Sequence, residues 1–148
     1  MLINQLKLLK NNIIQAGDLL VVSTGWWSTT RAYQSGAVTR NCPKLVEMQP
    51  EMFATISLGL ANKLIVKPGD MLVISSIHGE IKYRANVLPI INPLKVADRE
   101  IEIIGLSWHF GYQGIATGST ANDITPSVGD PNTMIPESKA FICNVKKA

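Results

Sequence analysis

The residues best suited to bind a ligand lie in one polar stretch near the end of the chain, from Trp108 to Lys139. Structureless loops longer than about 12–15 residues are uncommon and usually functional, so this stretch is predicted to be a binding loop. Glycines and prolines supply the positive-φ positions and the fixed φ angles that a long, shaped loop needs; they are Gly111, Gly114, Gly118, Gly129, Pro126, Pro131 and Pro136. Short polar side chains supply donors and acceptors; they are Asn122, Asp123, Thr125, Asp130, Asn132 and Thr133.

His109 is the residue of this stretch that could act as a general base, because imidazole titrates near neutral pH. The chain has no convergent acid–base set and no self-cleaving Gly-Ser signature, which argues against a free-standing small enzyme such as a decarboxylase. Cys42 and Cys143 lie far apart without a C-x-x-C motif, so neither an iron–sulfur cluster nor a zinc site is expected. His78 is expected to be a solvated turn residue.

Short runs rich in β-branched residues, separated by turn residues, predict a mainly β protein. The Lys67–Asp70 turn suits type II, with Gly69 at the positive-φ position, and Gly79 is expected to take a positive φ in a hairpin. Ser57 can cap a weak helix that ends near Leu64. The predicted strands are Asp18–Ser23, Phe53–Ile56, Met71–Ser76, Glu80–Val87, Ile101–Gly105 and Ala140–Val145.

Length and composition bound the class of protein. A chain of 148 residues with 46% hydrophobic and 17% charged residues is expected to form one domain with its own core. The net charge of +3 suits an anionic ligand, but the scattered Lys and Arg give no nucleic-acid motif. No apolar run is long enough for a membrane span, and the first segment, residues 1–15, is not expected to be a signal peptide because Lys7 and Lys10 interrupt it. The apolar positions of this segment suit one face of a short helix that docks on a neighbouring domain or partner.

Four segments, in this order, resemble the C-terminal molybdopterin-dinucleotide-binding domain of the catalytic subunit of molybdenum- or tungsten-dependent formate dehydrogenases, in the dimethyl-sulfoxide-reductase family. They are Thr24–Arg40 with its terminal GAVTRN, then Lys67–Ile81 (KPGDMLVISSIHGEI), Gly105–Gly114 (GLSWHFGYQG) and Ala121–Phe141 (ANDITPSVGDPNTMIPESKAF). The resemblance implies a six-stranded double-psi β-barrel with short helices and long cofactor-facing loops. Residues 18–148 would form this single domain, after a lead-in of residues 1–17.

The resemblance also implies a cofactor, bis(molybdopterin guanine dinucleotide) with molybdenum or tungsten, shared with upstream domains. Catalysis in that family is implied to lie on those domains, so this chain is expected not to turn over formate alone, and His109 is expected to contact the cofactor. The chain departs from the family pattern at Thr30–Ala32 and at Ser138. The residues that match cofactor-binding positions are Thr24, Gly25, Trp26, Tyr33, Gln34, Ser35, Gly36, Thr39, Arg40, Trp108, His109, Asn122 and Lys139.

Other interpretations stay open from sequence alone. Asn122 could form an Asx turn, Lys139 could be a surface charge, and Trp26 could be a buried aromatic at a loop hinge. The chain could be a fragment of a longer subunit or a separately encoded one, with the remainder of the catalytic subunit as its partner. It could also be a barrel that binds protein without any cofactor. The metal, the substrate and the cellular compartment are not encoded in these residues.

Overall fold

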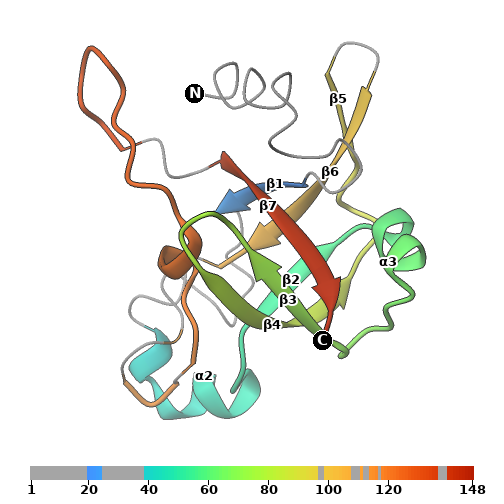
Figure 1. Ribbon diagram of the computed structural model, residues 1–148. Helices are drawn as coiled ribbons and strands as arrows, with labels where there is room; N and C mark the ends of the chain where they lie inside the picture. Colours follow the sequence, from blue (N-terminus) through green and yellow to red (C-terminus); the bar gives the residue numbers. More distant parts are fainter. Residues whose placement is uncertain are drawn as a thin grey trace.

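The structure is a computed structural model that describes residues 20–24, 39–96, 99–107, 111, 114–116, 118–136 and 140–148 (Figure 1). Strands dominate it, as the sequence predicts. They are β1 (Leu20–Thr24), β2 (Phe53–Ile56), β3 (Met71–Ser75), β4 (Glu80–Val87), β5 (Leu94–Val96), β6 (Arg99–Leu106) and β7 (Ala140–Lys147). The helices are short: α2 (Pro43–Met48), α3 (Leu58–Leu64) and the 3-10 turns η2 (Thr39–Asn41) and η3 (Ala121–Ile124).

The sheet curls until its pairings return to the first strand. Its order is β1-β7-β3-β4-β2-β6-β5, and β1 also pairs with β6, so six of the described strands form a ring. The remaining described strand, β5, pairs with β6 and is not part of the ring. The pairs β1–β6 and β2–β4 are parallel and the others are antiparallel. Each of the six ring strands has a neighbour on both sides, so among the described strands β5 alone keeps a free edge, and free edges are the usual sites of edge-to-edge aggregation.

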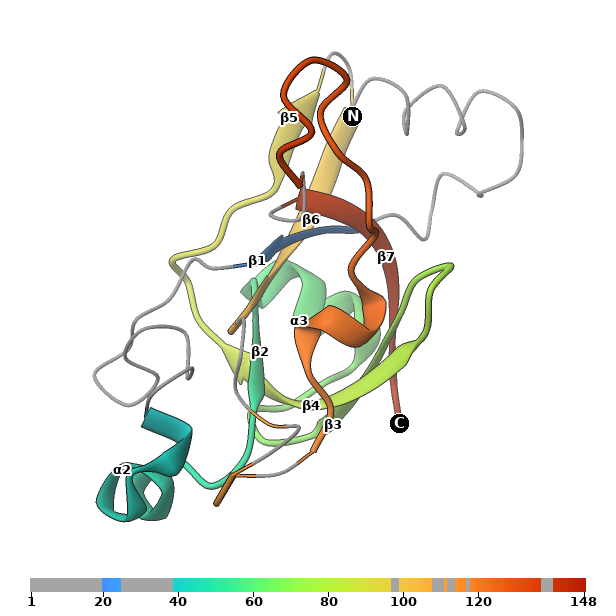
Figure 2. The same cartoon turned by 90° about the vertical axis from the view of Figure 1, so that its left-hand side faces the viewer.

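Strand direction gives the ring two different ends. β1 and β6 run side by side, with Thr24 opposite Leu106, and β7 begins beside them, with Ala140 opposite Ser23. β3 runs antiparallel to β7, with Leu72 opposite Lys147 and Ser75 opposite Asn144, so β3 ends toward the start of β7. The turn between β3 and β4 therefore lies at this same end. We call this the loop end, and Figure 2 views the molecule from it, with η3 lying across the ring.

The core fills the inside of the ring. In β4 every second residue from Ile81 to Ala85 is buried, which matches the two-residue period of a strand with one face inward. Burying an Ile, Leu or Phe side chain contributes about 1.5–3 kcal/mol, so this set provides the main stabilising term. The largest fully buried apolar residues include Tyr83, Phe141, Ile56, Leu72, Ile74, Ile81, Ile104, Leu106 and Ile124.

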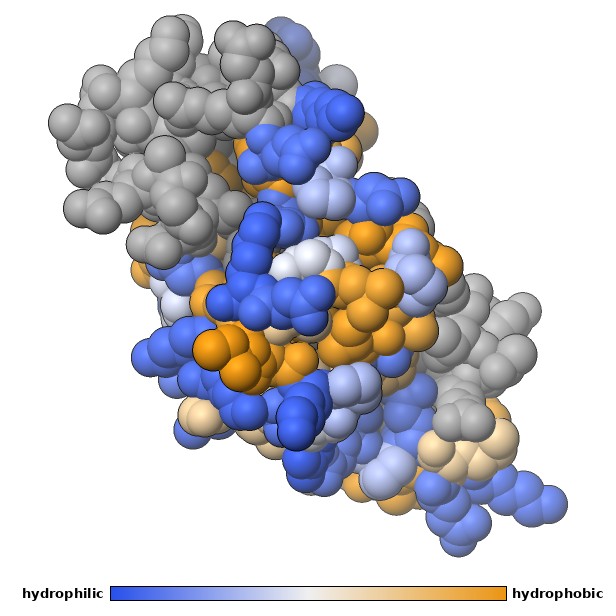
Figure 3. All heavy atoms as spheres, turned by 90° about the vertical axis from the view of Figure 1, so that its right-hand side faces the viewer, coloured by the Kyte–Doolittle hydropathy of each residue, from blue (hydrophilic) through white to orange (hydrophobic). Residues whose placement is uncertain are grey.

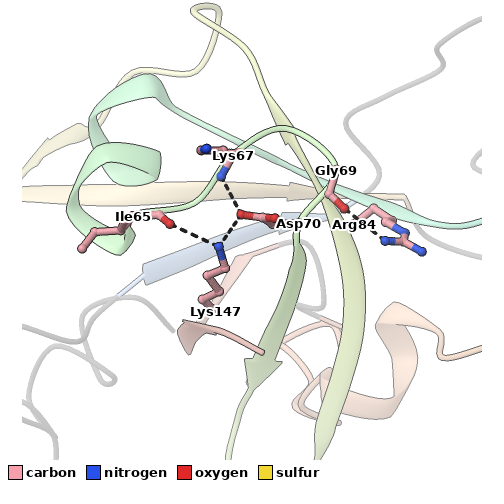
Figure 4. Close-up of polar contacts among 6 residues, drawn as sticks. All are labelled: Ile65, Lys67, Gly69, Asp70, Arg84 and Lys147. Atoms are coloured by element: carbon pink, nitrogen blue, oxygen red, sulfur yellow. Dashed lines mark hydrogen bonds and ion pairs between the residues drawn. The ribbon is translucent and has the colours of Figure 1, made fainter.

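The opposite end, which we call the turn end, carries α3 and the turn before β3. Gly69 has φ +87° and the Asp70 N–H donates to the Lys67 carbonyl at 3.1 Å, as predicted for this turn. The Asp70 carboxylate accepts from the Lys67 N–H at 2.8 Å and from Lys147 Nζ at 2.6 Å (Figure 4). This contact fixes the end of β7 to the turn.

The surface at the turn end mixes apolar and polar side chains, as Figure 3 shows for the face that bears α3. Leu58, the first residue of α3, is 54% exposed, and Ile65, which caps the helix in a left-handed conformation, is 82% exposed. Among the described helices, none has the length and the apolar character that a membrane crossing requires.

Two sequence expectations about glycines are wrong. Gly79 does not have a positive φ, and neither does Gly129. Gly79 is instead required by space, because a Cβ there would lie 2.7 Å from the Asp123 carbonyl oxygen. Met134, which lies between Gly129 and its bridge partner Pro136, has a positive φ of 58° instead.

Candidate cofactor-binding end

The parallel pair β1–β6 brings together the starts of two loops that the sequence singled out. Thr24 ends β1 and lies opposite Leu106, the last residue of β6. The first loop ends in η2, where Arg40 Nη1 donates to the Gly111 carbonyl at 3.4 Å. The Ala116 N–H donates back to the Arg40 carbonyl at 3.2 Å. The end of the first loop is therefore joined to the loop that follows β6.

Three glycines shape the loop after β6. Gly111, Gly114 and Gly118 all have positive φ, as predicted. A Cβ on Gly111 would lie 2.6 Å from the Ser119 carbonyl oxygen, and one on Gly114 would collide with the Asn41 side chain. The loop thus packs against η2 on one side and against the approach to η3 on the other, where only glycine fits.

The turn η3 displays Asn122 at the loop end. Thr120 and Asp123 cap it reciprocally: the Asn122 N–H donates to Thr120 Oγ1 at 3.0 Å, and the Thr120 N–H donates to Asp123 Oδ2 at 2.9 Å. Thr125 Oγ1 donates to the Ala121 carbonyl at 2.7 Å. Within the described part of the chain, the exposed Asn122 side chain makes no hydrogen bond. The turn is closed by its neighbours, which leaves the Asn122 amide available to a ligand.

The β3–β4 hairpin contacts the η3 segment through two side-chain hydroxyl groups. Ser76 Oγ donates to the Ile124 carbonyl at 2.7 Å, and the Tyr83 hydroxyl donates to the Ser119 carbonyl at 3.2 Å. Burial, and to a smaller degree the nearby charge of Asp123, raise the pKa of Tyr83 well above its usual value. The Tyr83 hydroxyl therefore keeps its proton and remains a donor.

Residues 126–136 form an arm that projects from the ring (Figures 1 and 2). It is a small hairpin, closed by a bridge between Gly129 and Pro136. Hydrogen bonds from the Thr133 N–H and hydroxyl and from the Asn132 N–H lower the pKa of Asp130. Met134 and Ile135 are 75% and 64% exposed. The predicted loop is therefore not structureless, because it contains the capped turn η3 and an arm closed by its own β-bridge.

Two buried polar groups at the loop end were not predicted. Ser107 follows β6 and is 2% exposed, and Gln49 lies just before β2 and is 9% exposed. Neither Ser107 Oγ nor Gln49 Nε2 has a hydrogen-bond partner in the described part of the chain. Ser107 directly precedes the predicted site residue Trp108, which was a usable signal, whereas the sequence around Gln49 gave none.

Four predicted site residues fall within the described part of the chain: Thr24, Thr39, Arg40 and Asn122. Arg40 is linked to the loop after β6, and Asn122 lies three residues beyond Ser119, whose carbonyl oxygen lies close to Gly111. The remaining predicted site residues lie outside the described residues, as does the predicted helix within residues 1–17; they are Gly25, Trp26, Tyr33, Gln34, Ser35, Gly36, Trp108, His109 and Lys139.

The two cysteines are free and lie in different surroundings. Cys42 is exposed before α2, and Cys143 is buried in β7, where burial raises the pKa of its thiol well above the usual value. His78 is exposed, as expected for its turn. Among the described residues, no group of three or more His, Cys, Asp or Glu side chains could hold a metal ion.

Residues 20–142 match the model of the molydopterin dinucleotide binding domain. The chain belongs to this family. The dinucleotide-binding domain is 40% identical over 123 residues to the formate dehydrogenase subunit alpha of Megalodesulfovibrio gigas, covering 82% of this chain and 12% of that protein. It is 46% identical over 101 residues to the formate dehydrogenase-O major subunit of Escherichia coli, covering 68% of this chain and 10% of that protein. The resemblance noted from sequence is thus confirmed, and the domain spans about a tenth of these relatives' length.

A solved structure shares the fold of this binding domain. The acetylene hydratase from Pelobacter acetylenicus superposes with a TM-score of 0.65 at 15% sequence identity, covering 100% of this chain and 20% of that one. At this identity the likeness concerns the fold alone.

Proposed function

We propose that the chain is the molybdopterin guanine dinucleotide-binding domain of a formate-dehydrogenase-like molybdenum or tungsten oxidoreductase. It would complete one side of a cofactor site whose other side belongs to the remainder of the catalytic subunit, and it would not be catalytic alone. The relatives are formate dehydrogenase subunits, and the chain covers only 10–12% of their length. Both facts support a binding domain that works together with other parts of a catalytic subunit.

We further propose that the ring is a six-stranded double-psi β-barrel. Its two parallel pairs, β1–β6 and β2–β4, each join strands that other strands separate along the sequence. The antiparallel pair β2–β6 connects the two parallel pairs, and β7 pairs with β1 on one side and β3 on the other. Two parallel pairs within a ring of six strands support the proposal of a double-psi barrel.

One observation carries the assignment of the site: the parallel pair β1–β6 places the starts of both predicted loops side by side, and Arg40 and Gly111 then join them. Asn122 is presented at the same end on a closed turn. A pterin or guanine edge needs a group that both donates and accepts, which a side-chain amide provides. A pyrophosphate needs a cation, which Arg40 provides.

The residues at the loop end fit such a cofactor. Ser107 Oγ and Gln49 Nε2 are buried polar atoms without partners in the described part of the chain, and buried groups of this kind are usually satisfied by a ligand, a water or another chain. When bound, the metal–pterin group supplies the redox chemistry, while this chain binds it, orients it and excludes water. We propose that the predicted site residues outside the described part contribute to the same cradle.

The proposal is tested by the pterin content of the complex that forms around this chain in its own cells. Asn122→Ala should lower the pterin retained per complex, because it removes the exposed amide and leaves the backbone of η3 capped by Thr120 and Asp123. Asn62→Ala is the matched control, since Asn62 is an exposed asparagine on α3 at the turn end. Equal pterin loss from both variants would contradict the assignment of Asn122, and a wild-type complex without pterin would overturn the proposed function.

A second function, a protein-binding module without cofactor, is favoured by one feature. Met134 and Ile135 expose apolar surface on the arm, which hydrogen bonds of Asp130 to Thr133, Met134 and Ile135 hold together. Exposed apolar residues that lie together on a surface are typical of protein contacts. A stable complex that lacks both pterin and metal would favour this alternative.

A further inference from the structure

We infer that the β3–β4 hairpin positions Asn122 for the dinucleotide, through the hydroxyl groups of Ser76 and Tyr83. This inference rests on the proposed function, and it adds two positioning residues that are not among the residues matched to cofactor-binding positions. Neither side chain is proposed to touch the cofactor.

The two hydroxyls hold the chain on both sides of η3. Tyr83 donates to the carbonyl of Ser119, which precedes the turn, at 3.2 Å. Ser76 donates to the carbonyl of Ile124, the last residue of the turn, at 2.7 Å. Asn122 lies between these two anchored carbonyls, so the hairpin fixes the position of the segment that carries it.

Both donors are themselves oriented. Ser76 Oγ accepts the His78 N–H at 3.0 Å, which occupies a lone pair and leaves the hydroxyl proton for Ile124. Tyr83 is 1% exposed, and its side chain packs in the hydrophobic core inside the ring of strands. A packed aromatic ring has few rotamers, so its hydroxyl reaches one place on the loop.

Packing between the hairpin and the turn leaves little room for η3 to shift. A Cβ on Gly79 would lie 2.7 Å from the Asp123 carbonyl oxygen, so the hairpin approaches the turn as closely as glycine allows. On the other side, a Cβ on Gly111 would lie 2.6 Å from the Ser119 carbonyl oxygen. The turn is thus confined between the hairpin and the loop after β6.

Confinement matters because an amide recognises a heterocycle edge by direction as well as by distance. Binding groups must be held within about 0.5 Å of the productive geometry, usually by hydrogen bonds from the residues behind them. The capping box of Thr120 and Asp123 fixes the internal shape of η3, but it does not fix η3 relative to the strands. The contacts of Ser76 and Tyr83 provide this second constraint.

The test uses the pterin-loaded complex and two measurements: the rate at which pterin is lost during dialysis, and the thermal midpoint. Tyr83→Phe and Ser76→Ala each remove one net hydrogen bond to the loop and should speed pterin loss by roughly three- to tenfold. Ser76→Thr keeps the hydroxyl and should restore slow loss. Ser57→Ala is the control at the turn end: its hydroxyl bonds to Glu102, so it should lower the midpoint and leave the pterin loss rate unchanged.

A double-mutant cycle separates positioning from general stability. If Tyr83 acts through Asn122, Tyr83→Phe should have little further effect on pterin loss in the Asn122→Ala background. Additive effects, or unchanged pterin loss in both Tyr83→Phe and Ser76→Ala, would overturn the inference. A faster loss in Asn122→Ala with no change in the hairpin variants would overturn this inference alone and leave the proposed function in place.

Discussion

A single carboxylate, Glu102, fastens α3 to the ring of strands. It is 8% exposed on β6, accepts from Ser57 Oγ at 3.0 Å and forms an ion pair with Lys63 Nζ at 2.7 Å. Ser57 in turn caps α3 by accepting from the Leu60 N–H at 2.9 Å. The strand, the cap and the helix are therefore connected through one buried group.

Glu102→Gln keeps the size of the side chain but loses the charge. We expect the free energy of unfolding to fall by about 1–2 kcal/mol, because hydrogen bonds to a charged acceptor are stronger than neutral ones. Lys63→Gln should cost less, since the Lys63 side chain is 66% exposed and solvent screens its charge. Urea unfolding of both variants measures the difference, and an equal loss in the two would contradict the role given to the buried carboxylate.

Asp70 makes stability depend on acid pH. A hydrogen bond from Lys147 and one from the Lys67 N–H lower the pKa of Asp70 below its ordinary value in the folded chain. A carboxyl whose folded pKa is depressed stabilises the fold at pH values above the unfolded pKa, and this contribution is lost as the pH falls through the folded pKa.

The wild type should therefore be more stable than Asp70→Asn by a constant amount above about pH 5, since an unfolded Asp titrates near pH 3.9. Below about pH 4 the gap should narrow as the carboxylate protonates. Denaturant unfolding of both proteins at a series of pH values measures this gap, and a gap that stays constant into acid would contradict the role of Lys147 and Lys67.

Sequence could identify Arg40 and Asn122 only through family resemblance, because their residue types alone fit many loops. Ser76 and Tyr83 could not be identified as site residues, since their partners, Ile124 and Ser119, are distant in the chain. Their own surroundings looked like an ordinary hairpin and an ordinary strand.

At the scale of elements, substitution of glycine by alanine is expected to have opposite effects on stability at Gly59 and at Gly79. A Cβ on Gly59, inside α3, would meet its nearest neighbours at 3.7 and 3.8 Å, which is ordinary contact. Gly59→Ala should therefore raise the free energy of unfolding by up to about 1 kcal/mol through helix propensity. Gly79→Ala should instead lower it, because the added methyl would meet the Asp123 carbonyl at 2.7 Å.

Thermal unfolding of the two variants, alongside the wild type, measures this contrast. A stabilising Gly79→Ala would show that the hairpin and η3 are less closely packed than the structure indicates. A destabilising Gly59→Ala would show that α3 cannot accept a side chain at this position.

Most strands could be predicted because each combines an apolar pattern with a clear turn. The Met71–Ser75 strand, for example, follows a Pro-Gly-Asp turn and precedes a glycine hairpin. The short strand Leu94–Val96 and the helix Pro43–Met48 were missed. The strand has too few residues to show a period, and the helix has one buried residue, Val46, so neither carries the hydrophobic repeat on which prediction depends.

At the scale of the molecule, β1 is the strand that closes the ring. Pairing of β1 with β6 and β7 joins strands that are far apart in sequence, and no periodicity predicts such partners. The closed arrangement could be expected from the number of short strands, but its order and the parallel pairs could not.

Truncation tests both closure and the proposed boundary at residue 18. A chain that begins at Asp18 should unfold cooperatively like the full chain, if residues 1–17 are a lead-in. A chain that begins at Gly25 lacks β1, which exposes the edges of β6 and β7, and it should aggregate or lose its cooperative transition. Circular dichroism melting and light scattering compare the two, and a cooperative transition in the shorter chain would contradict the closing role of β1.

The position of β7 in the ring also has a consequence for biosynthesis. β7 pairs with β1 on one side and with β3 on the other, so one edge of each of these two strands stays open until β7 is available. The ring of strands therefore cannot close before β7 has left the ribosome, and pairing between strands that lie far apart in the sequence implies slow folding. Until β7 pairs, the open edges of β1 and β3 can pair with other chains, which makes the unfinished ring prone to aggregation.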